Sequence, residues 1–468
     1  MAEPPAGLPR HRLMVPMVVA FAFFLEGLDS TIIATAIPAM AEGLGETPLR
    51  LNLALTAYLL SAAVFIPVSG WVADRFGMRN TFTAALGIFA LGSMASGLAP
   101  DLVTLVAARA VQGFGGALMA PLGRLILLRS FPRSEFATAI SYMNIPSVIG
   151  PTMGPLIGGL IAGHASWRWI FFVGVPFCLL GMVLAWRHVK DTETAPPVRF
   201  DIPGFAMVGV AMLALQTGLF GLGQGFLPLW LDFFLLAAAG LLIVAYVRWS
   251  LARPNAALDF RQMRVRSFRV ALLWGGITRV GMNAVPFLLP LMLQLGFGMS
   301  PVLSGSLTFV MSLGTIMART IAVKMLRAMG FDRLLLLNTF LSAAATAGFA
   351  LLDQSTPHLL IAGWVLVFGM VRNIQFNTLQ TLTYSDMPSE GLSKATSLGG
   401  GIQQLTMGVG VSVGASLLAI VAGSESVLPA EDFRTVFLIA AVIPLLGLPG
   451  IRSLRPQDGA TVSGHRRG

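Results

Sequence analysis

Two carboxylic acids, Glu26 and Asp29, lie in an apolar stretch of the sequence that covers residues 13–38. They are three residues apart, so their side chains lie on one face if the stretch is a helix. Burial favours the protonated form of a carboxyl group, and a second acid nearby favours it further. Such a pair can hold one proton near neutral pH and release it when its surroundings open to water. This pattern indicates a proton carrier; the alternative is that one or both acids only cap a helix or form a structural pair.

Arg109 and Gln112 form a second polar pair, again three residues apart, in the stretch "RAVQGFGGA". An arginine does not lose its proton in a protein, so Arg109 is a fixed positive charge. Close to a carboxylate it favours the ionised acid, and once it moves away the acid can take up a proton. We therefore assign Asp29, Glu26 and Arg109 to proton coupling. The alternative for Arg109 is a purely structural ion pair.

Further arginines interrupt other apolar stretches. Arg279 and Arg372 lie too deep to reach the ends of their stretches, and such charges usually face a bundle interior or a water-filled cavity. Arg124 and Arg319 lie closer to stretch ends, which their long side chains can reach. We expect a substrate cavity lined by polar and aromatic side chains, namely Gln112, Arg279, Asn283, Arg372, Asn373 and Phe376.

The elements that must position these groups are membrane-spanning helices. Of the 468 residues, 55% are hydrophobic and 11% are charged, and the mean hydropathy is +0.78. Apolar runs of about 20 residues recur along the chain, which is the length that crosses a hydrocarbon layer about 30 Å thick. We predict an all-α polytopic membrane protein with 14 spans, at 13–38, 51–70, 81–99, 102–128, 136–163, 167–187, 203–223, 227–248, 269–296, 303–323, 334–352, 358–384, 394–421 and 433–451.

The net charge of +10 follows this predicted topology. The loops on one side of the spans, together with both chain ends, hold 23 of the 31 lysines and arginines, and the other side holds only Arg50, Arg168 and Arg434. Basic loops remain in the cytoplasm, so we place both termini there. Topology thus accounts for the basic residues without a nucleic-acid partner. The single cysteine, Cys178, excludes an internal disulfide, and no metal cluster is indicated.

One short pattern occurs in each half of the chain. "GWVADRFGMRN" and "KMLRAMGFDRLLL", aligned on Gly77 and Gly330, are both charged, glycine-containing connections that lead into an apolar helix. Transporters are commonly built from such repeats, with substrate and ion sites near mid-membrane at the repeat interface. We predict two six-helix bundles around a central cavity, with two extra spans packed outside them as a hairpin. The expected divisions are 1–190 for the first bundle, 191–268 for the insert and 269–468 for the second bundle.

The stretch "GPTMGPLIGGLIAG" places Gly150, Gly154 and Gly158 on one stripe of a helix, so another backbone can approach closely. Pro151 and Pro155 remove backbone donors and favour a bend. Tight packing alone explains the glycines. The repeated Gly-Pro pairs favour a bend that also seals a cavity against ion leak.

Together these motifs resemble the major facilitator superfamily, specifically its 14-helix drug:proton antiporter branch. The matching residues of the loop motif are Gly70, Asp74, Arg75, Gly77 and Arg79; those of the fourth-span motif are Arg109, Gln112, Gly113 and Gly115. The fifth-span antiporter motif matches at Gly150, Pro151, Gly154, Pro155, Gly158 and Gly159, and the first-span motif at Asp29, Thr31, Ala36 and Pro38. Three departures are Ala34 where the family usually has Asn, Arg327 where an acid would mirror Asp74, and Glu26, which is outside the pattern.

The resemblance implies a proton-coupled efflux transporter of the bacterial inner membrane that works by alternating access. It implies lipophilic or amphipathic substrates such as drugs, hence antibiotic resistance, a monomer driven by the proton gradient without a cofactor, and a gating role for the loop that begins at Gly70. An anionic metabolite, siderophore or metal chelate is the alternative cargo, favoured by Arg279 and Arg372. A membrane-embedded enzyme or sensor is a remote alternative, because no nucleotide-binding or catalytic motif occurs and no loop exceeds about 20 residues.

Overall fold

The computed structural model describes residues 10–131, 133–189, 200–225, 227–253, 256–388, 391–423 and 428–463. Within these ranges every regular element is helical, and the chain divides into two compact units. Unit 1 comprises Met1–Glu46 with Leu53–Phe200, and unit 2 comprises Thr47–Asn52 with Asp201–Gly468. The prediction of an all-α protein is confirmed.

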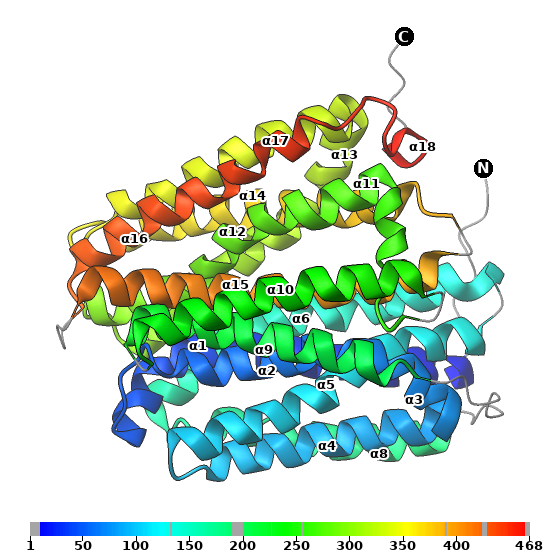
Figure 1. Cartoon of the computed structure of the whole chain (residues 1–468). Helices are drawn as coiled ribbons and strands as arrows, with labels where there is room; N and C mark the ends of the chain where they lie inside the picture. The colour runs from blue at the N-terminus through cyan, green and yellow to red at the C-terminus, as the bar shows by residue number, and fades with distance from the viewer. Residues whose placement is uncertain are drawn as a thin grey trace. The chain divides into compact units, whose positions relative to one another are not determined.

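Unit 1 consists of long helices joined by short connections (Figure 1). Its elements are α1 (Arg10–Leu44), α2 (Asn52–Phe65), η1 (Ile66–Val68), α3 (Ser69–Phe76), α4 (Met78–Leu98), α5 (Leu102–Ser130), α6 (Arg133–His164), α7 (Trp169–Phe172) and α8 (Val175–His188). The first helix, α1, packs along α6 and also touches α5 and α8. Helix α4 packs against α5 and α8.

Unit 2 repeats this arrangement, since its helix α12 packs on α15 as α1 packs on α6. Its helices are α9 (Ile202–Gln224), α10 (Leu229–Ala252), α11 (Arg266–Arg269), α12 (Gly275–Leu291), α13 (Pro301–Ala347), α14 (His358–Ser385), α15 (Leu392–Ala422), α16 (Ala430–Val442), α17 (Leu448–Ile451) and α18 (Ala460–Ser463). Shorter turns are η2 (Phe260–Arg264), η3 (Val270–Trp274), η4 (Met292–Gly296), η5 (Gly348–Leu351) and η7 (Ile443–Gly447), of which η3 and η4 are π-helical.

Thirteen helical segments of the described chain are long and apolar enough to cross a membrane, and they match 13 of the predicted spans. The remaining predicted span, 136–163, falls on α6, whose side chains are described from Pro146 onward. The extra pair, α9 and α10, belongs to unit 2, where α9 packs against both α10 and α15 (Figure 1). Helix α10 carries many exposed large apolar side chains: Leu229, Trp230, Phe233, Phe234, Leu241, Ile243, Val244 and Leu251.

The two glycines that aligned the repeat have matching backbones. Gly77 has φ 84° and ψ 147°, and Gly330 has φ 74° and ψ 173°. Both lie in a region that residues with a Cβ rarely occupy, and each is the only non-helical residue between two helices. The sequence predicted longer loops here, from 71 to 80 and from 324 to 333. The structure corrects this: helix α3 continues to Phe76, because one glycine is sufficient to turn the chain.

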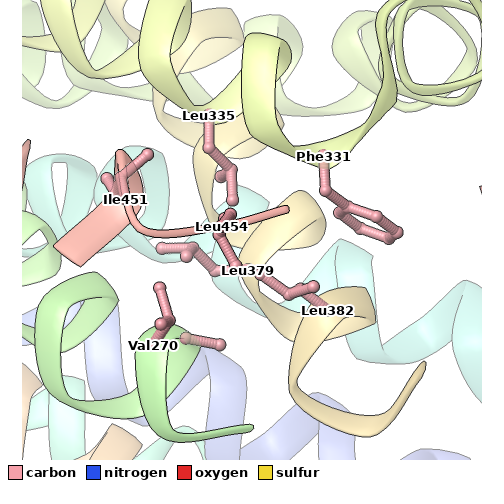
Figure 2. Packing of buried hydrophobic residues seen from close by; sticks show 8 residues of the cluster. Val270, Phe331, Leu335, Leu379, Leu382, Ile451 and Leu454 are labelled. Atoms are coloured by element: carbon pink, nitrogen blue, oxygen red, sulfur yellow. The ribbon is translucent and has the colours of Figure 1, made fainter. Parts of the chain in front are cut away.

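A cluster of buried apolar side chains lies at the end of unit 2 that its basic loops predict to be cytoplasmic. Figure 2 shows buried side chains from η3, α13, α14, α17 and the segment after α17 meeting there. The labelled residues are Val270, Phe331, Leu335, Leu379, Leu382, Ile451 and Leu454. Lipid tails are as apolar as these side chains, so close packing rather than escape from water holds such helices together.

Candidate functional site

A buried ion pair joins α1 to α5 at the predicted coupling residues. The Arg109 Nη1 atom donates to Asp29 Oδ2 at 2.7 Å, and the Gln112 Nε2 atom donates to Asp29 Oδ1 at 2.8 Å. Arg109 Nη1 also donates to Gln112 Oε1 at 2.6 Å, which closes a three-membered network. Both carboxylate oxygens therefore accept a hydrogen bond, one from a guanidinium and one from an amide.

The surroundings of the pair exclude water and give Arg109 further partners. Arg109 and Gln112 are fully buried, and Asp29 is 7% exposed. Arg109 Nε donates to the Ala54 carbonyl of α2 at 3.2 Å, and its guanidinium carbon lies 4.5 Å from the centre of the Tyr58 ring. Arg109 therefore has two acceptors besides Asp29, the Ala54 carbonyl and Gln112 Oε1.

Glycines hold α5 close enough to its neighbours for these contacts. A Cβ at Gly113 would meet the Tyr58 carbonyl of α2, and one at Gly115 would meet the Phe89 backbone of α4. A Cβ at Gly92 of α4 would likewise meet the backbone of Gln112. Helix α5 is capped at its N-terminus by Asp101, whose carboxylate accepts a hydrogen bond from the Thr104 N–H at 2.8 Å. This hydrogen bond holds the pKa of Asp101 below its usual range.

Helix α1 is fixed from its other side by the Gly-Pro motif of α6. A Cβ at Gly150, Gly154 or Gly158 would collide with Phe24, Thr31 or Ile32 of α1, respectively. The expected close approach of two backbones is thus present. Helix α6 runs unbroken through its prolines, so the Gly-Pro motif packs α6 against α1 without interrupting α6.

The prolines of α6 also explain why α1 carries threonines. Pro155 has no N–H, so the Pro151 carbonyl loses its partner within the helix. The Thr31 hydroxyl lies 3.2 Å from that carbonyl and can donate to it, and the Thr35 hydroxyl lies 3.3 Å from the Pro155 carbonyl. Thr31 is two residues from Asp29, so this contact positions the coupling acid as well.

Glu26 does not join the Asp29 network. It is half-buried and makes no hydrogen bond or ion pair with another described residue. Arg124 of α5 and Asp29 are the charges that act on it most strongly, and Arg124 itself is exposed, 5.8 Å from the Phe23 ring centre. The two acids of the first span therefore have different surroundings: one is fully paired and one is not.

The predicted gating residues lie around the end of α3. Asp74 is half-buried, Gly70 and Arg75 are exposed, and Gly77 is the turn described above. The Arg75 guanidinium lies 6.0 Å from the Trp71 ring, and that of Arg79 lies 4.5 Å from the Trp186 ring of α8. These aromatic contacts were not expected from the loop motif.

A second group of predicted residues comes together in unit 2. The guanidinium carbons of Arg279 (α12) and Arg372 (α14) lie 5.2 Å and 4.8 Å from the centre of the same ring, Phe376. Arg372 Nη2 donates to Asn283 Oδ1 at 3.3 Å, and Asn283 Nδ2 donates to the Thr406 carbonyl of α15 at 3.4 Å. Arg279 is 1% exposed and Asn283 is 4% exposed.

Asn373 is not hydrogen-bonded to this cluster in the described chain; its side chain accepts a hydrogen bond from Asn377 Nδ2 at 2.6 Å. Gln112, which was expected to line the substrate cavity, is instead part of the Asp29 network in unit 1. Tyr58 and the Ala54 carbonyl, which also contact Arg109, were not predicted from the sequence. They occupy an apolar span without any motif, and a backbone carbonyl leaves no trace in residue type.

The comparisons with known proteins agree with this architecture. The family model described as "Major Facilitator Superfamily" matches residues 19–411. Proteins named "Putative multidrug resistance protein MdtD" from Escherichia coli strain CFT073 and from Pectobacterium carotovorum are both 35% identical, over 94% and 93% of each chain, respectively.

Solved structures show the same fold at low sequence identity. One is a POT family transporter in complex with 5-aminolevulinic acid, at 15% identity and a TM-score of 0.68, covering 93% of this chain and 96% of that one. Another is a D-xylose-proton symporter, at 14% identity and a TM-score of 0.64, covering 94% and 98%. The chain therefore belongs to the Major Facilitator Superfamily and is a multi-pass membrane transporter rather than an enzyme.

Proposed function

We propose that the protein is a proton-coupled exporter in which Asp29 carries the proton and Arg109 competes with that proton for the carboxylate. The observation that carries the proposal is the buried network of Asp29, Arg109 and Gln112. Asp29 lies in the middle of its span, 15 residues from either end of Met14–Leu44. A carboxylate at that depth needs either a cation or a proton.

The network supports a switch between these two states. With Arg109 at 2.7 Å, the carboxylate is neutralised by the guanidinium. When Asp29 takes up a proton, Arg109 keeps two acceptors, the Ala54 carbonyl and Gln112 Oε1, so its hydrogen bonding is not lost with the ion pair. Proton binding thus exchanges one set of partners for another, and we expect this exchange to accompany the change between outward and inward access.

Glu26 takes a different role in this proposal. It lies about one helical turn from Asp29 and lacks a hydrogen-bonding partner among the described residues. A carboxylate of this kind favours binding of a cationic substrate. The second possibility, that Glu26 is the main proton carrier and the Asp29 network is structural, is separated by the experiment below.

The remaining parts of the proposal follow from the charge pattern and the family. Both termini lie in the cytoplasm of a bacterial inner-membrane protein. The residues from Gly70 to Arg79 act as a cytoplasmic gate between two six-helix bundles, with α9 and α10 as an accessory hairpin. The protein acts as a monomer and exports small lipophilic or amphipathic compounds, in line with the multidrug resistance named for its relatives.

The test is transport in proteoliposomes with an imposed pH gradient and ethidium as the substrate, while a trapped dye reports lumenal pH. Asp29→Asn is expected to abolish gradient-driven ethidium transport and the accompanying proton movement, because an amide does not carry a proton in this pH range. Glu26→Gln is expected to retain proton movement with a neutral substrate and to lose ethidium preferentially.

Asp353→Asn is the matched control, because Asp353 lies in an exposed turn outside the spans and should leave transport unchanged. If Asp29→Asn still exchanges protons for ethidium at the parent rate, Asp29 is structural. Loss of all proton movement in Glu26→Gln alone would assign the proton to Glu26.

A further inference from the structure

We infer that Arg279, Arg372 and Phe376 form a binding site in unit 2 for the carboxylate of an aromatic or otherwise planar organic acid. As a site for cargo, the inference rests on the proposed export function and names a substrate class for it. The binding of the acid itself stands on the unit 2 geometry alone.

The first observation is that the two arginines have no anion of their own. Among the described residues, no carboxylate lies within 4.0 Å of either guanidinium, and the ion pairs of unit 2 involve other residues. Arg279 Nε and Nη2 and Arg372 Nε are buried without a hydrogen-bond partner within the described chain. Arg372 makes one bond, to the neutral Asn283.

The second observation is that the charges are close together. Both guanidinium carbons face the Phe376 ring, at 5.2 Å and 4.8 Å from its centre, so they are at most 10.0 Å apart, the sum of those two distances. An arginine stays charged at any relevant pH. Arg279 is buried and Arg372 is half-buried, so their positive charges repel each other with little screening by water, and an anion bound to both would replace that repulsion with attraction.

The third observation is the depth of the site. Arg279 lies 13 and 17 residues from the ends of Arg266–Gly296, and Arg372 lies 14 and 13 residues from the ends of His358–Ser385. At 1.5 Å per residue, both are about 20 Å along the helix from either end of their spans. The phosphate of a lipid headgroup lies at the membrane surface, so the depth favours a dissolved substrate over a lipid as the source of the anion.

The chemistry of the side chains narrows the ligand. Guanidinium groups present a planar fork that matches the two oxygens of a carboxylate. The Phe376 ring lies beside both guanidiniums and offers an apolar contact for the hydrocarbon part of such an acid. Both arginines have N–H groups without a hydrogen-bond partner among the described residues, so each can donate to one carboxylate, and an aromatic dicarboxylate is the probe of choice.

The experiment measures binding of radiolabelled phthalate to the purified full-length protein in nanodiscs of neutral phosphatidylcholine. Phthalate should bind saturably, and the uncharged analogue phthalamide should fail to compete. Arg279→Gln and Arg372→Gln should each weaken binding by about tenfold or more, as expected when a charge-assisted contact is lost. Arg372→Lys should retain part of the affinity, because it keeps the charge and loses the fork.

Arg319→Gln is the matched control, since Arg319 is exposed and should leave affinity unchanged. The comparison of phthalate with phthalamide uses the wild-type protein, so it remains decisive if an arginine variant does not fold. Equal competition by the two compounds, or full affinity in both glutamine variants, would overturn the inference. Displacement of phthalate by phosphatidylglycerol in the nanodisc would identify a lipid phosphate as the occupant and would also overturn it.

Failure of this inference is distinguishable from failure of the proposed function. Gradient-driven ethidium transport without phthalate binding leaves proton-coupled export standing and removes the acid site. Phthalate binding that depends on the arginines, without any gradient-driven transport, keeps the acid site and removes proton coupling.

Discussion

The intramembrane arginines of the two units differ in what neutralises them. Arg109 in unit 1 has a carboxylate at 2.7 Å, an amide oxygen at 2.6 Å and a backbone carbonyl at 3.2 Å, all supplied by its own unit. Arg279 in unit 2 is buried to a similar degree and has no such acceptor among the described residues. The same residue type at similar burial therefore suits two proposed purposes: an internal switch needs an internal partner, and a ligand site must leave its charge unpaired.

The largest expected effect is on stability, and it comes from removing the charge of Arg109 in unit 1 or of Arg279 in unit 2. Arg109→Ala should lower stability by about 3–5 kcal/mol, because it leaves Asp29 as a buried charge without its cation. Arg279→Gln should instead leave stability unchanged or raise it in the absence of ligand, because it removes a charge that nothing compensates. Thermal unfolding of both variants in neutral nanodiscs measures the difference.

The double variant Asp29→Asn with Arg109→Gln is the control for unit 1, and it should recover most of the stability lost by Arg109→Ala. A loss in Arg279→Gln as large as that in Arg109→Ala would break the comparison. It would mean that Arg279 is neutralised within the folded chain after all.

A medium effect is expected at the helix contacts that support each site. Gly154→Ala places a Cβ against Thr31, near Asp29, and Gly410→Ala places one 2.5 Å from the Asn283 Cβ, near Arg372. Each should cost about 1–3 kcal/mol by overpacking. Gly154→Ala should impair proton-coupled transport and leave phthalate binding intact. Gly410→Ala should weaken phthalate binding and leave proton-coupled transport intact.

Gly240→Ala is the control for both glycines, because nothing lies within 4 Å of the position where its Cβ would be. It should leave the melting temperature unchanged or raise it, as alanine favours a helix more than glycine does. If Gly154→Ala and Gly410→Ala behave like Gly240→Ala, neither site depends on close backbone approach.

The smallest effect is expected at an ion pair outside the membrane. Burial opposes ionisation of Asp259, but the hydrogen bonds from Arg261 and the charges of Arg261 and Lys394 outweigh it and hold the pKa of this carboxyl below its usual value. A lowered pKa in the folded protein stabilises it above the unfolded value of about 3.9, and this contribution is lost as pH falls through the folded pKa.

Asp259→Asn should therefore be less stable than the wild type near neutral pH, by no more than about 1 kcal/mol because Arg261 and Lys394 are partly exposed. The difference should shrink as pH falls through the folded pKa of Asp259. Melting temperatures between pH 3 and 7 test this. A difference as large as that of Arg109→Ala would show that the partial exposure of Arg261 and Lys394 does not weaken their ion pairs with Asp259.

Sequence predicted the fold well because hydropathy acts over whole spans. The 13 matching spans, and the paired glycines Gly77 and Gly330, were visible as composition and as a repeated motif. The contact of Asp29 with Arg109 was expected only as a possibility, because spacing along a helix does not say which helix lies opposite. Tyr58 and the Thr31–Pro151 contact were missed, since both depend on the pairing of separate helices.

The attachment of the α9–α10 hairpin has a consequence for how compounds reach the protein from the lipid. Ser412 of α15 donates to Gln216 Oε1 at 2.9 Å, and Ser416 donates to the Leu219 carbonyl at 2.7 Å, so polar bonds hold α9 on α15 within the membrane. In hydrocarbon such bonds have no competing water. Helix α9 therefore covers this face of α15, and we expect a lipophilic compound that comes from the bilayer to approach unit 2 along another helix.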